Sequence, residues 1–229
     1  MNRCKRNVAA LLVFGLAPLF SFAQIARAEE MTFRLVQVGD PAKCGTSCPA
    51  VIAAEGEITN DTPSAFLSFV ESNIESANLH AVVFLDSPGG KVVASMQLGK
   101  LLRRVGAAAI VAQVDPAGRN SMDQFMAARC LSACVYALMG AKKRVIPPQS
   151  LVGIHRMFTY VDTADPDSAT VLRYRRYDNG EMAAVLSRYT SEMGVSPALI
   201  AMAEHISSDR IHIMTRAEIS RFHLGTARF

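Results

Sequence analysis

Four short segments of the sequence carry residue types that could take part in acyl transfer. The first is Ser87-Pro88-Gly89-Gly90, which follows a short apolar run. Proline stiffens such a turn and glycine permits positive φ, so backbone N–H groups can point outward and bind an oxyanion. Taken alone, the segment is more typical of a tight strand-to-helix turn that binds nothing.

The second segment places a serine between two cysteines. Ser132 lies between Cys130 and Cys134, at the start of a short apolar run with small neighbours. A serine at the start of a helix exposes its hydroxyl beside free N–H donors and the positive helix end, as in nucleophile elbows. The G-x-S-x-G pattern is absent, and by itself Ser132 reads as a capping or packing residue.

The remaining two segments supply a histidine and a carboxylate. His155 follows the apolar run 151–154, and Asp209 precedes the last predicted helix. A general base and the carboxylate that orients it are the partners a serine nucleophile requires. In isolation, His155 is typical of a structural residue and Asp209 of a helix cap or of a surface pair with Arg210.

The elements that would position these residues follow an α/β pattern. From Ala50 onward apolar runs alternate with helical patterns, which predicts a parallel sheet covered by helices. A polar, irregular stretch at 115–129 reads as a loop or an inserted flap. Strands are predicted at 51–58, 81–85, 108–114, 144–146 and 151–154, and helices at 91–105 and 131–139 and from Thr62-Pro63, Ser196-Pro197 and Thr215.

A long C-terminal helix is also predicted, running from the polar stretch 162–168 through Glu192. Arg173, Arg175 and Arg176 would then lie on its solvated face.

Composition excludes several classes of protein. Half of the 229 residues are hydrophobic and 19% are charged, so the chain is not disordered and can form one sizeable domain or two small ones. Four of the 24 basic residues lie in residues 1–28, which hold no acid. The other 20 therefore balance the 20 acidic residues. This balance gives no electrostatic reason to expect a nucleic-acid partner.

Residues 1–28 have the features of a secretory signal peptide. Arg3, Lys5 and Arg6 precede a mostly apolar, uncharged run, and Ala26-Arg27-Ala28 forms an A-x-A cleavage site. An uncleaved membrane anchor is the alternative, because the uncharged run approaches spanning length. Cleavage would give a periplasmic or secreted protein with no later membrane span.

Four cysteines remain after residue 28, as two C-x-x-x-C pairs: Cys44/Cys48 and Cys130/Cys134. In an oxidising compartment disulfides are expected, and pairing within each motif is favoured over the two other connectivities. A four-thiolate zinc site is the less favoured alternative, because structural zinc usually has tighter spacing. The first pair lies in an N-terminal extension, residues 29–49, and no bound metal or cofactor is expected.

The order of the four segments at successive strand-to-helix junctions resembles the ClpP/crotonase superfamily. The resemblance runs from about Val51 to Gly225 and is greatest to the Clp protease proteolytic subunit, in particular to exported forms without an ATPase. It implies an α/β fold in which βαβ units form a spiral with a mostly parallel sheet and surrounding helices, over a domain of residues 50–229.

The resemblance also implies roles for single residues. Ser132 matches the family's nucleophile and His155 its general base, with Asp209 orienting the imidazole. Gly90, in the Ser-Pro-Gly-Gly turn, and Ala133 match the two residues whose N–H groups form the oxyanion hole. The cysteines at 130 and 134 depart from the family pattern, as does alanine at 133, where the protease usually has methionine.

The function implied is that of an exported, ATP-independent serine hydrolase, expected to be a peptidase. It would act on a peptide or other acyl substrate, without a cofactor, and would assemble as a homo-oligomer. Two alternatives stay open: a non-catalytic exported binding protein that keeps the fold, and a crotonase-type acyl-CoA enzyme. Export and the Ser/His/Asp set disfavour the second.

Overall fold

The computed structural model describes residues 29–76, 78–115, 126–165, 168 and 170–228. The predicted signal peptide lies outside these residues, as does most of the predicted flap at 115–129. The central element is a five-stranded sheet in the order β1-β2-β3-β4-β8. Strands β2, β3, β4 and β8 are parallel, and β1 is antiparallel to β2, so the predicted mostly parallel sheet is confirmed.

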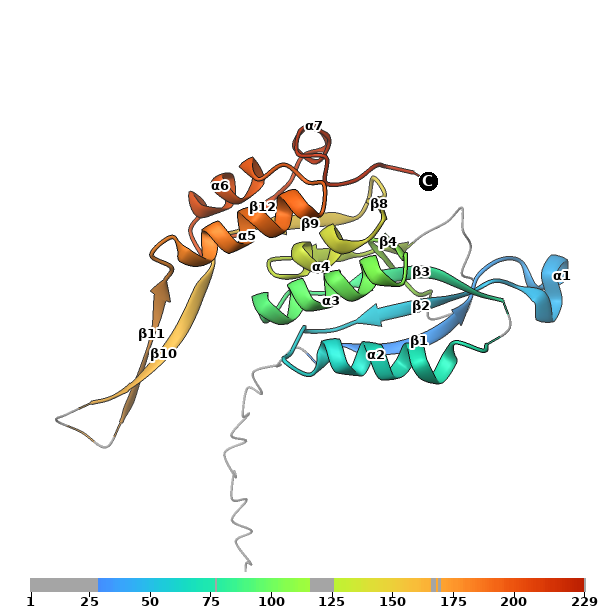
Figure 1. Cartoon of the computed structure of the whole chain (residues 1–229), viewed down its shortest axis with the longest axis horizontal. Helices are drawn as coiled ribbons and strands as arrows, with labels where there is room; N and C mark the ends of the chain where they lie inside the picture. The colour runs from blue at the N-terminus through green and yellow to red at the C-terminus, as the bar shows by residue number, and fades with distance from the viewer. Residues whose placement is uncertain (1–28, 77, 116–125, 166–167, 169, 229) are drawn as a thin grey trace, which may run out of the picture.

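The strands of this sheet are joined by helices that lie along one side of it (Figure 1). Parallel strands need crossover connections, and helices supply them here. The α2 helix follows β2, α3 follows β3, and α4 precedes β8. The bounds are β1 Thr32–Gln37, β2 Ala50–Glu55, α2 Thr62–Asn73, β3 Leu79–Asp86, α3 Val92–Arg104, β4 Ala108–Ile110, α4 Cys134–Gly140 and β8 Lys143–Val145.

Side chains alternate between the two faces of the sheet, as the pleat requires. Ile52 and Val83 pack into the larger hydrophobic cluster, together with residues of the covering helices. Val51 and Phe84 point to the other face and form a second, smaller cluster. Burial on both faces explains why these strands read as continuous apolar runs in the sequence.

The N-terminal extension contributes to this sheet. Its residues 32–37 form β1 at the sheet edge, in register with β2 from Thr32 opposite Glu55 to Gln37 opposite Ala50. A short helical turn follows, made of α1 (Pro41–Cys44) and a 3-10 segment (Gly45–Ser47). Cys44 and Cys48 are bonded to each other across this turn.

A second sheet, in the order β12-β9-β7, carries two of the candidate site residues at its strand ends. Strand β7 is Arg129–Leu131, β9 is Leu151–Ile154 and β12 is His212–Ile213. Because β7 and β9 are parallel, the residues that follow them emerge at the same edge of the sheet. The helix predicted at 131–139 begins only at Cys134, since Leu131 ends β7.

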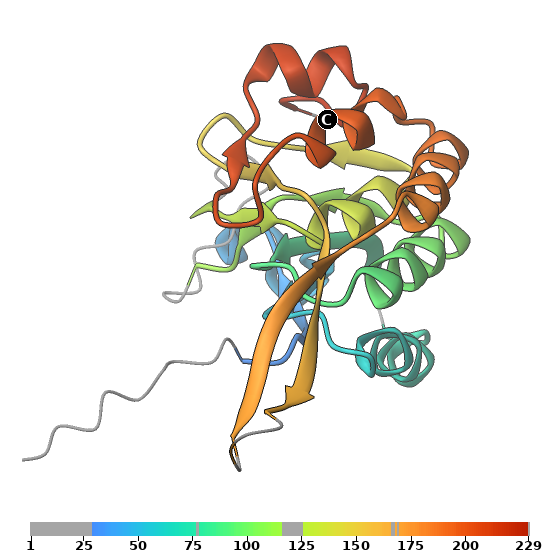
Figure 2. The same cartoon turned by 90° about the vertical axis from the view of Figure 1, so that its left-hand side faces the viewer.

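The long helix predicted through Glu192 is wrong over its first half. Residues Phe158–Ala164 (β10) and Val171–Tyr177 (β11) form an antiparallel hairpin, and only Glu181–Glu192 (α5) is helical. The hairpin projects away from the rest of the molecule (Figures 1 and 2). Aromatic and β-branched residues in both segments favour a strand, and a cross-strand Arg173–Asp162 pair joins them.

The C-terminal elements pack beside α4 and the second sheet. They are α5, α6 (Ala198–Glu204) and α7 (Arg216–Arg221). Earlier in the chain, two small strands, β5 (Ala112–Gln113) and β6 (Met126–Ala127), pair with each other near the end of β4. The last helix is preceded at Thr215 by a capping box: Thr215 Oγ1 accepts from the Glu218 N–H, and the Glu218 carboxylate accepts from the Thr215 N–H. Within the described residues, no helix has the length and apolar character needed to cross a membrane.

Candidate active site

The Ser87–Gly90 turn is joined directly to strand β7. The Ser87 N–H donates to the Arg129 carbonyl at 2.7 Å, and the Leu131 N–H donates to the Ser87 carbonyl at 3.0 Å. The Asp86 carboxylate accepts from the Arg129 N–H at 3.0 Å. These bonds fix the end of β3 and the turn beside the residue that follows β7, which is Ser132.

Both glycines of the turn are required by space as well as by conformation. Gly90 has φ of 137°, and a Cβ there would lie 2.1 Å from the Ile58 carbonyl oxygen. Gly89 has φ of 110°, and its Cβ would lie 2.9 Å from the Cβ of Ser132. The turn is therefore packed against Ile58 at Gly90 and against Ser132 at Gly89, so only glycine fits at either position.

Gly90 is left with an uncommitted N–H group. The Ile58 carbonyl accepts from Lys91, and the Ile58 N–H donates to the Gly89 carbonyl, so the chain is held on both sides of Gly90. Within the part of the chain that the structure describes, neither Gly90 nor Ala133 donates a backbone hydrogen bond. Two such donors near a serine hydroxyl are the components of an oxyanion hole.

Ser132 has the backbone of a nucleophile elbow. Its φ is 53°, in the left-handed region that residues other than glycine seldom adopt. Its N–H donates to the Gly153 carbonyl at 2.8 Å, and its carbonyl accepts from Val135, so the conformation is held from both sides. Such strain at the junction of a strand and a helix lifts the side chain out toward the site.

A disulfide spans this elbow. Cys130 and Cys134 are bonded, with their Cα atoms 5.2 Å apart, and both are fully buried. The structure thus places the two cysteines of each C-x-x-x-C motif at disulfide distance, which is the pairing that the sequence favours. The described residues include no group of three or more His, Cys, Asp or Glu side chains placed to hold a metal ion.

His155 lies one residue beyond β9 and is half-buried. Its Nδ1 is 2.8 Å from the Arg156 carbonyl oxygen, so Nδ1 carries the proton and Nε2 is free to accept one. Its ring centroid lies 6.1 Å from that of Phe158, the first residue of the hairpin.

The structure brings Gly90, Ser132, Ala133 and His155 to one cleft of about 1090 Å³. The hairpin and the start of α5 form its other wall, so the hairpin, which the sequence analysis had predicted to be helical, is also part of the site. Tyr136, one helical turn beyond Ser132, lines it as well, and burial together with the Glu204 carboxylate raises its pKa, which keeps the hydroxyl neutral. The hairpin and α5 residues lining the cleft are Phe158, Thr159, Tyr160, Arg173, Arg176, Tyr177, Glu181 and Met182.

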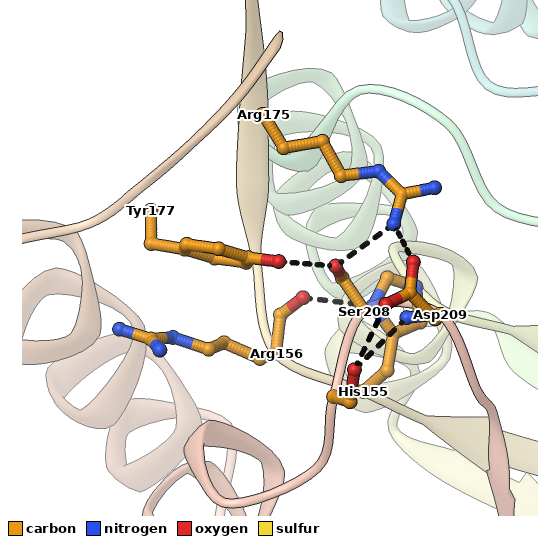
Figure 3. Close-up of polar contacts among 7 residues, drawn as sticks. His155, Arg156, Arg175, Tyr177, Ser208 and Asp209 are labelled. Carbon is orange, nitrogen blue, oxygen red and sulfur yellow. Dashed lines mark hydrogen bonds and ion pairs between the residues drawn. The ribbon is translucent and has the colours of Figure 1, made fainter.

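Asp209 is not hydrogen-bonded to His155. Its carboxylate pairs with the guanidinium of Arg175 from β11 (Figure 3). It also accepts a hydrogen bond from the Ser207 hydroxyl at 3.3 Å. The cause is the hairpin itself, which the sequence prediction lacked: as a strand, β11 carries Arg175 to the loop before β12. Tyr177, which lines the cleft, and Arg175, which contacts Phe158 of the cleft wall, are thus the residues that sequence reasoning missed. The alternating aromatic and basic residues of 171–177 were the available signal.

No protein-family model matches the chain, and no curated protein sequence matches it. Solved structures do. A mutant of the 1510-N membrane-bound stomatin-specific protease aligns over 77% of this chain and 78% of its own, with 16% identity and a TM-score of 0.52. ClpP1 from Listeria monocytogenes aligns over 78% of this chain and 91% of its own, with 17% identity and a TM-score of 0.47.

The chain has the ClpP/crotonase-like fold. At 16% identity this likeness establishes the fold alone. In this ClpP-like chain the two sheets meet at the Ser87–Gly90 turn, and the cleft lies where the turn, the elbow and the end of β9 converge.

Proposed function

We propose that this chain is an exported, ATP-independent serine hydrolase that cleaves peptides through an acyl-enzyme intermediate. The observation that carries the proposal is the geometry around Ser132. A strained serine at the start of a helix, two uncommitted backbone N–H groups and a histidine with a free Nε2 line the same cleft. This is the set of groups that acyl transfer requires.

The reaction would begin with His155 Nε2 taking the proton of the Ser132 hydroxyl as Oγ attacks the substrate carbonyl carbon. The oxyanion formed would accept hydrogen bonds from the Gly90 and Ala133 N–H groups, each worth about 3–4 kcal/mol to the transition state. His155 would then give the proton to the leaving amine as the C–N bond breaks. A water molecule would then give a proton to His155 Nε2 as its oxygen bonds to the acyl carbon, and His155 would pass that proton to Ser132 Oγ as the ester C–O bond breaks and the acid leaves.

Peptide is the substrate class that the cleft favours. Its volume of about 1090 Å³ exceeds what a small ligand needs. Its lining includes apolar, basic and acidic side chains from the hairpin and α5, which suits a chain with varied side chains. The stomatin-specific protease that shares the fold acts on a protein, as its name states.

Export is supported by the two disulfides, because such bonds persist in oxidising compartments. A periplasmic or secreted enzyme has no ATP pool for a partner unfoldase, hence the proposed ATP independence. Mass spectrometry of the protein from its native host should find Glu29 as the first residue. A full-length cytoplasmic product would contradict export without touching the proposed chemistry.

The test of the chemistry is labelling with a fluorophosphonate probe, which reacts with activated serines. Wild-type protein should be labelled, Ser132→Ala should not, and Ser191→Ala, which removes an exposed serine of α5, should react as the wild type does. A folded wild-type protein that never reacts would favour the alternative of a binding protein with this fold.

A further inference from the structure

We propose that the main-chain carbonyl of Arg156 orients His155, and that Asp209 positions the hairpin wall of the cleft through Arg175. The inference rests on the proposed serine hydrolase function. It replaces the role expected for Asp209, that of orienting the imidazole, with a different one.

The first step concerns the imidazole. In serine hydrolases a hydrogen bond at Nδ1 fixes the tautomer and leaves Nε2 to act as the base. Here that bond is made by the Arg156 carbonyl oxygen, 2.8 Å from Nδ1 (Figure 3). Nδ1 has only one proton to donate, so a good bond to this carbonyl leaves none for a carboxylate.

The acceptor is on a residue that is itself immobilised. The Arg156 N–H donates to the Ile206 carbonyl at 2.9 Å. The guanidinium carbon lies 4.5 Å from the centroid of the Tyr177 ring, and Nε lies 3.4 Å from a Glu204 carboxylate oxygen, an ion pair without hydrogen-bond geometry. Fixed from both ends, Arg156 holds its carbonyl toward His155.

The second step concerns Asp209. Its side chain is 69% exposed, whereas the carboxylate of a catalytic triad is buried beside the histidine. Its oxygens accept from the guanidinium of Arg175 and from the Ser207 hydroxyl. The carboxylate is therefore committed to the hairpin and to its own loop.

The third step connects Arg175 with the cleft wall, through Ser208, Tyr177 and Phe158. Arg175 Nη1, the atom that pairs with Asp209, also donates to the Ser208 hydroxyl at 3.2 Å. The Tyr177 hydroxyl, from the same strand, lies 2.9 Å from the Ser208 hydroxyl. The guanidinium carbon lies 4.7 Å from the ring centroid of Phe158, which is the hairpin residue next to His155. Asp209 thus acts on the cleft wall through Arg175, and its loss should loosen substrate binding rather than the chemical step.

The kinetic test uses Asp209→Asn, Arg175→Gln and the double variant on the mature full chain, with labelled casein as the substrate. Each single variant should raise KM by about 3- to 10-fold, change kcat less than 2-fold and leave the shape of the pH profile of kcat/KM unchanged, as expected for one partly exposed ion pair. The double variant should be no worse than either single one. Asp40→Asn, which breaks the exposed ion pair with Lys43, is the control and should change neither constant.

A triad role for Asp209 gives a different result. Where a carboxylate holds the tautomer, its conversion to the amide lowers kcat by about 10⁴-fold. A loss of that kind in Asp209→Asn, with Arg175→Gln unaffected, would overturn the inference.

A second measurement does not depend on hydrolysis. Nitrogen-15 NMR of the His155 ring, assigned by comparison with His155→Gln, should show Nδ1 protonated and Nε2 unprotonated in both wild type and Asp209→Asn. A tautomer change in Asp209→Asn would overturn the inference. An unchanged tautomer in a protein that no fluorophosphonate labels would instead overturn the proposed function and leave the Arg156 contact standing.

Discussion

Gly89 and Gly90 contribute to the site through their backbone, which packs too closely against its neighbours for any side chain to fit. The turn passes between the Ile58 carbonyl and Ser132 at distances that leave no room for Cβ. This close approach keeps the turn against Ser132, and Gly90 and Ser132 line the same cleft. The Ser-Pro-Gly-Gly segment is therefore a spatial requirement of the site as well as a turn.

Substitution of Gly90 by alanine should reveal that requirement. The new Cβ would lie 2.1 Å from the Ile58 carbonyl oxygen, which is part of the backbone and cannot move aside. We therefore expect the unfolding free energy to fall by about 4–5 kcal/mol, which is the upper end for single substitutions, and all activity to be lost. Gly106→Ala is the control, since Gly106 also has positive φ but no atom within 4 Å of the added Cβ. It should cost only about 1–2 kcal/mol. Equal melting temperatures for the two variants would contradict the account.

At the scale of elements, the sequence predicted the buried strands and their connecting helices well. Ala81–Leu85 and Leu151–Ile154 are continuous apolar runs of strand length, which is the pattern expected of strands buried on both faces of a sheet. Ser132 and His155 were singled out by their match to the family pattern, since the strand before Ser132, β7, was not predicted and each residue is typical of a structural role in isolation.

The hairpin and its contacts were not predictable in the same way. Both of its strands are mostly exposed, so no periodic apolar face marks them. The pairing of Asp209 with Arg175 joins residues 34 positions apart and depends on that hairpin. The free Nε2 of His155 likewise depends on a main-chain oxygen, which no side-chain pattern can indicate.

The two disulfides allow a matched comparison, since each closes a loop with a sequence separation of 4. Loop entropy predicts that breaking either one costs about 2 kcal/mol of unfolding free energy. The Cys130→Ala/Cys134→Ala variant should also lose most activity, because that bond holds the elbow of Ser132. The Cys44→Ala/Cys48→Ala variant should keep its activity. Hydrolysis rates and denaturant midpoints measure both effects, and equal activity in the two variants would argue against the elbow role.

The last helix gives a prediction about pH. Burial alone would raise the pKa of Glu218, but hydrogen bonds from the Thr215 N–H and from His212 outweigh it and hold that pKa below its usual value. A carboxyl whose pKa is lowered in the folded state stabilises the protein above its unfolded pKa, and the gain is lost as pH falls through the folded value. Glu218→Gln should therefore unfold more easily than wild type at pH 7, and the difference should shrink as pH falls below the unfolded glutamate pKa of about 4.3 and be lost below the lowered folded pKa. A difference in denaturant midpoint that persists at low pH would point to a steric cause.

At the scale of the whole molecule, the hairpin is the element that reaches furthest from the core (Figure 2). It exposes large apolar side chains, including Val171 at 67% and Leu172 at 54%. An apolar surface on a projecting element is typical of a contact between chains. We therefore expect the homo-oligomer implied by the family resemblance to use this surface.

Light scattering after size-exclusion chromatography tests that expectation. The mature protein should have a mass above that of one chain, and Leu172→Glu should lower it, since burial of a charge at the contact is costly. Leu67→Glu, at an exposed leucine of α2, is the control and should leave the mass unchanged. A monomeric wild-type protein would contradict the assembly and leave the active site unaffected.

The central claim is that Ser132 is a nucleophile whose oxyanion is held by Gly90 and Ala133. A crystal structure of the mature protein after reaction with a fluorophosphonate tests it most directly. The account predicts phosphorus bonded to Ser132 Oγ, a phosphonyl oxygen accepting from both N–H groups at hydrogen-bond distance, and His155 Nε2 facing Oγ. An unmodified Ser132 in a fully folded protein, or an adduct whose oxygen points away from Gly90, would contradict it.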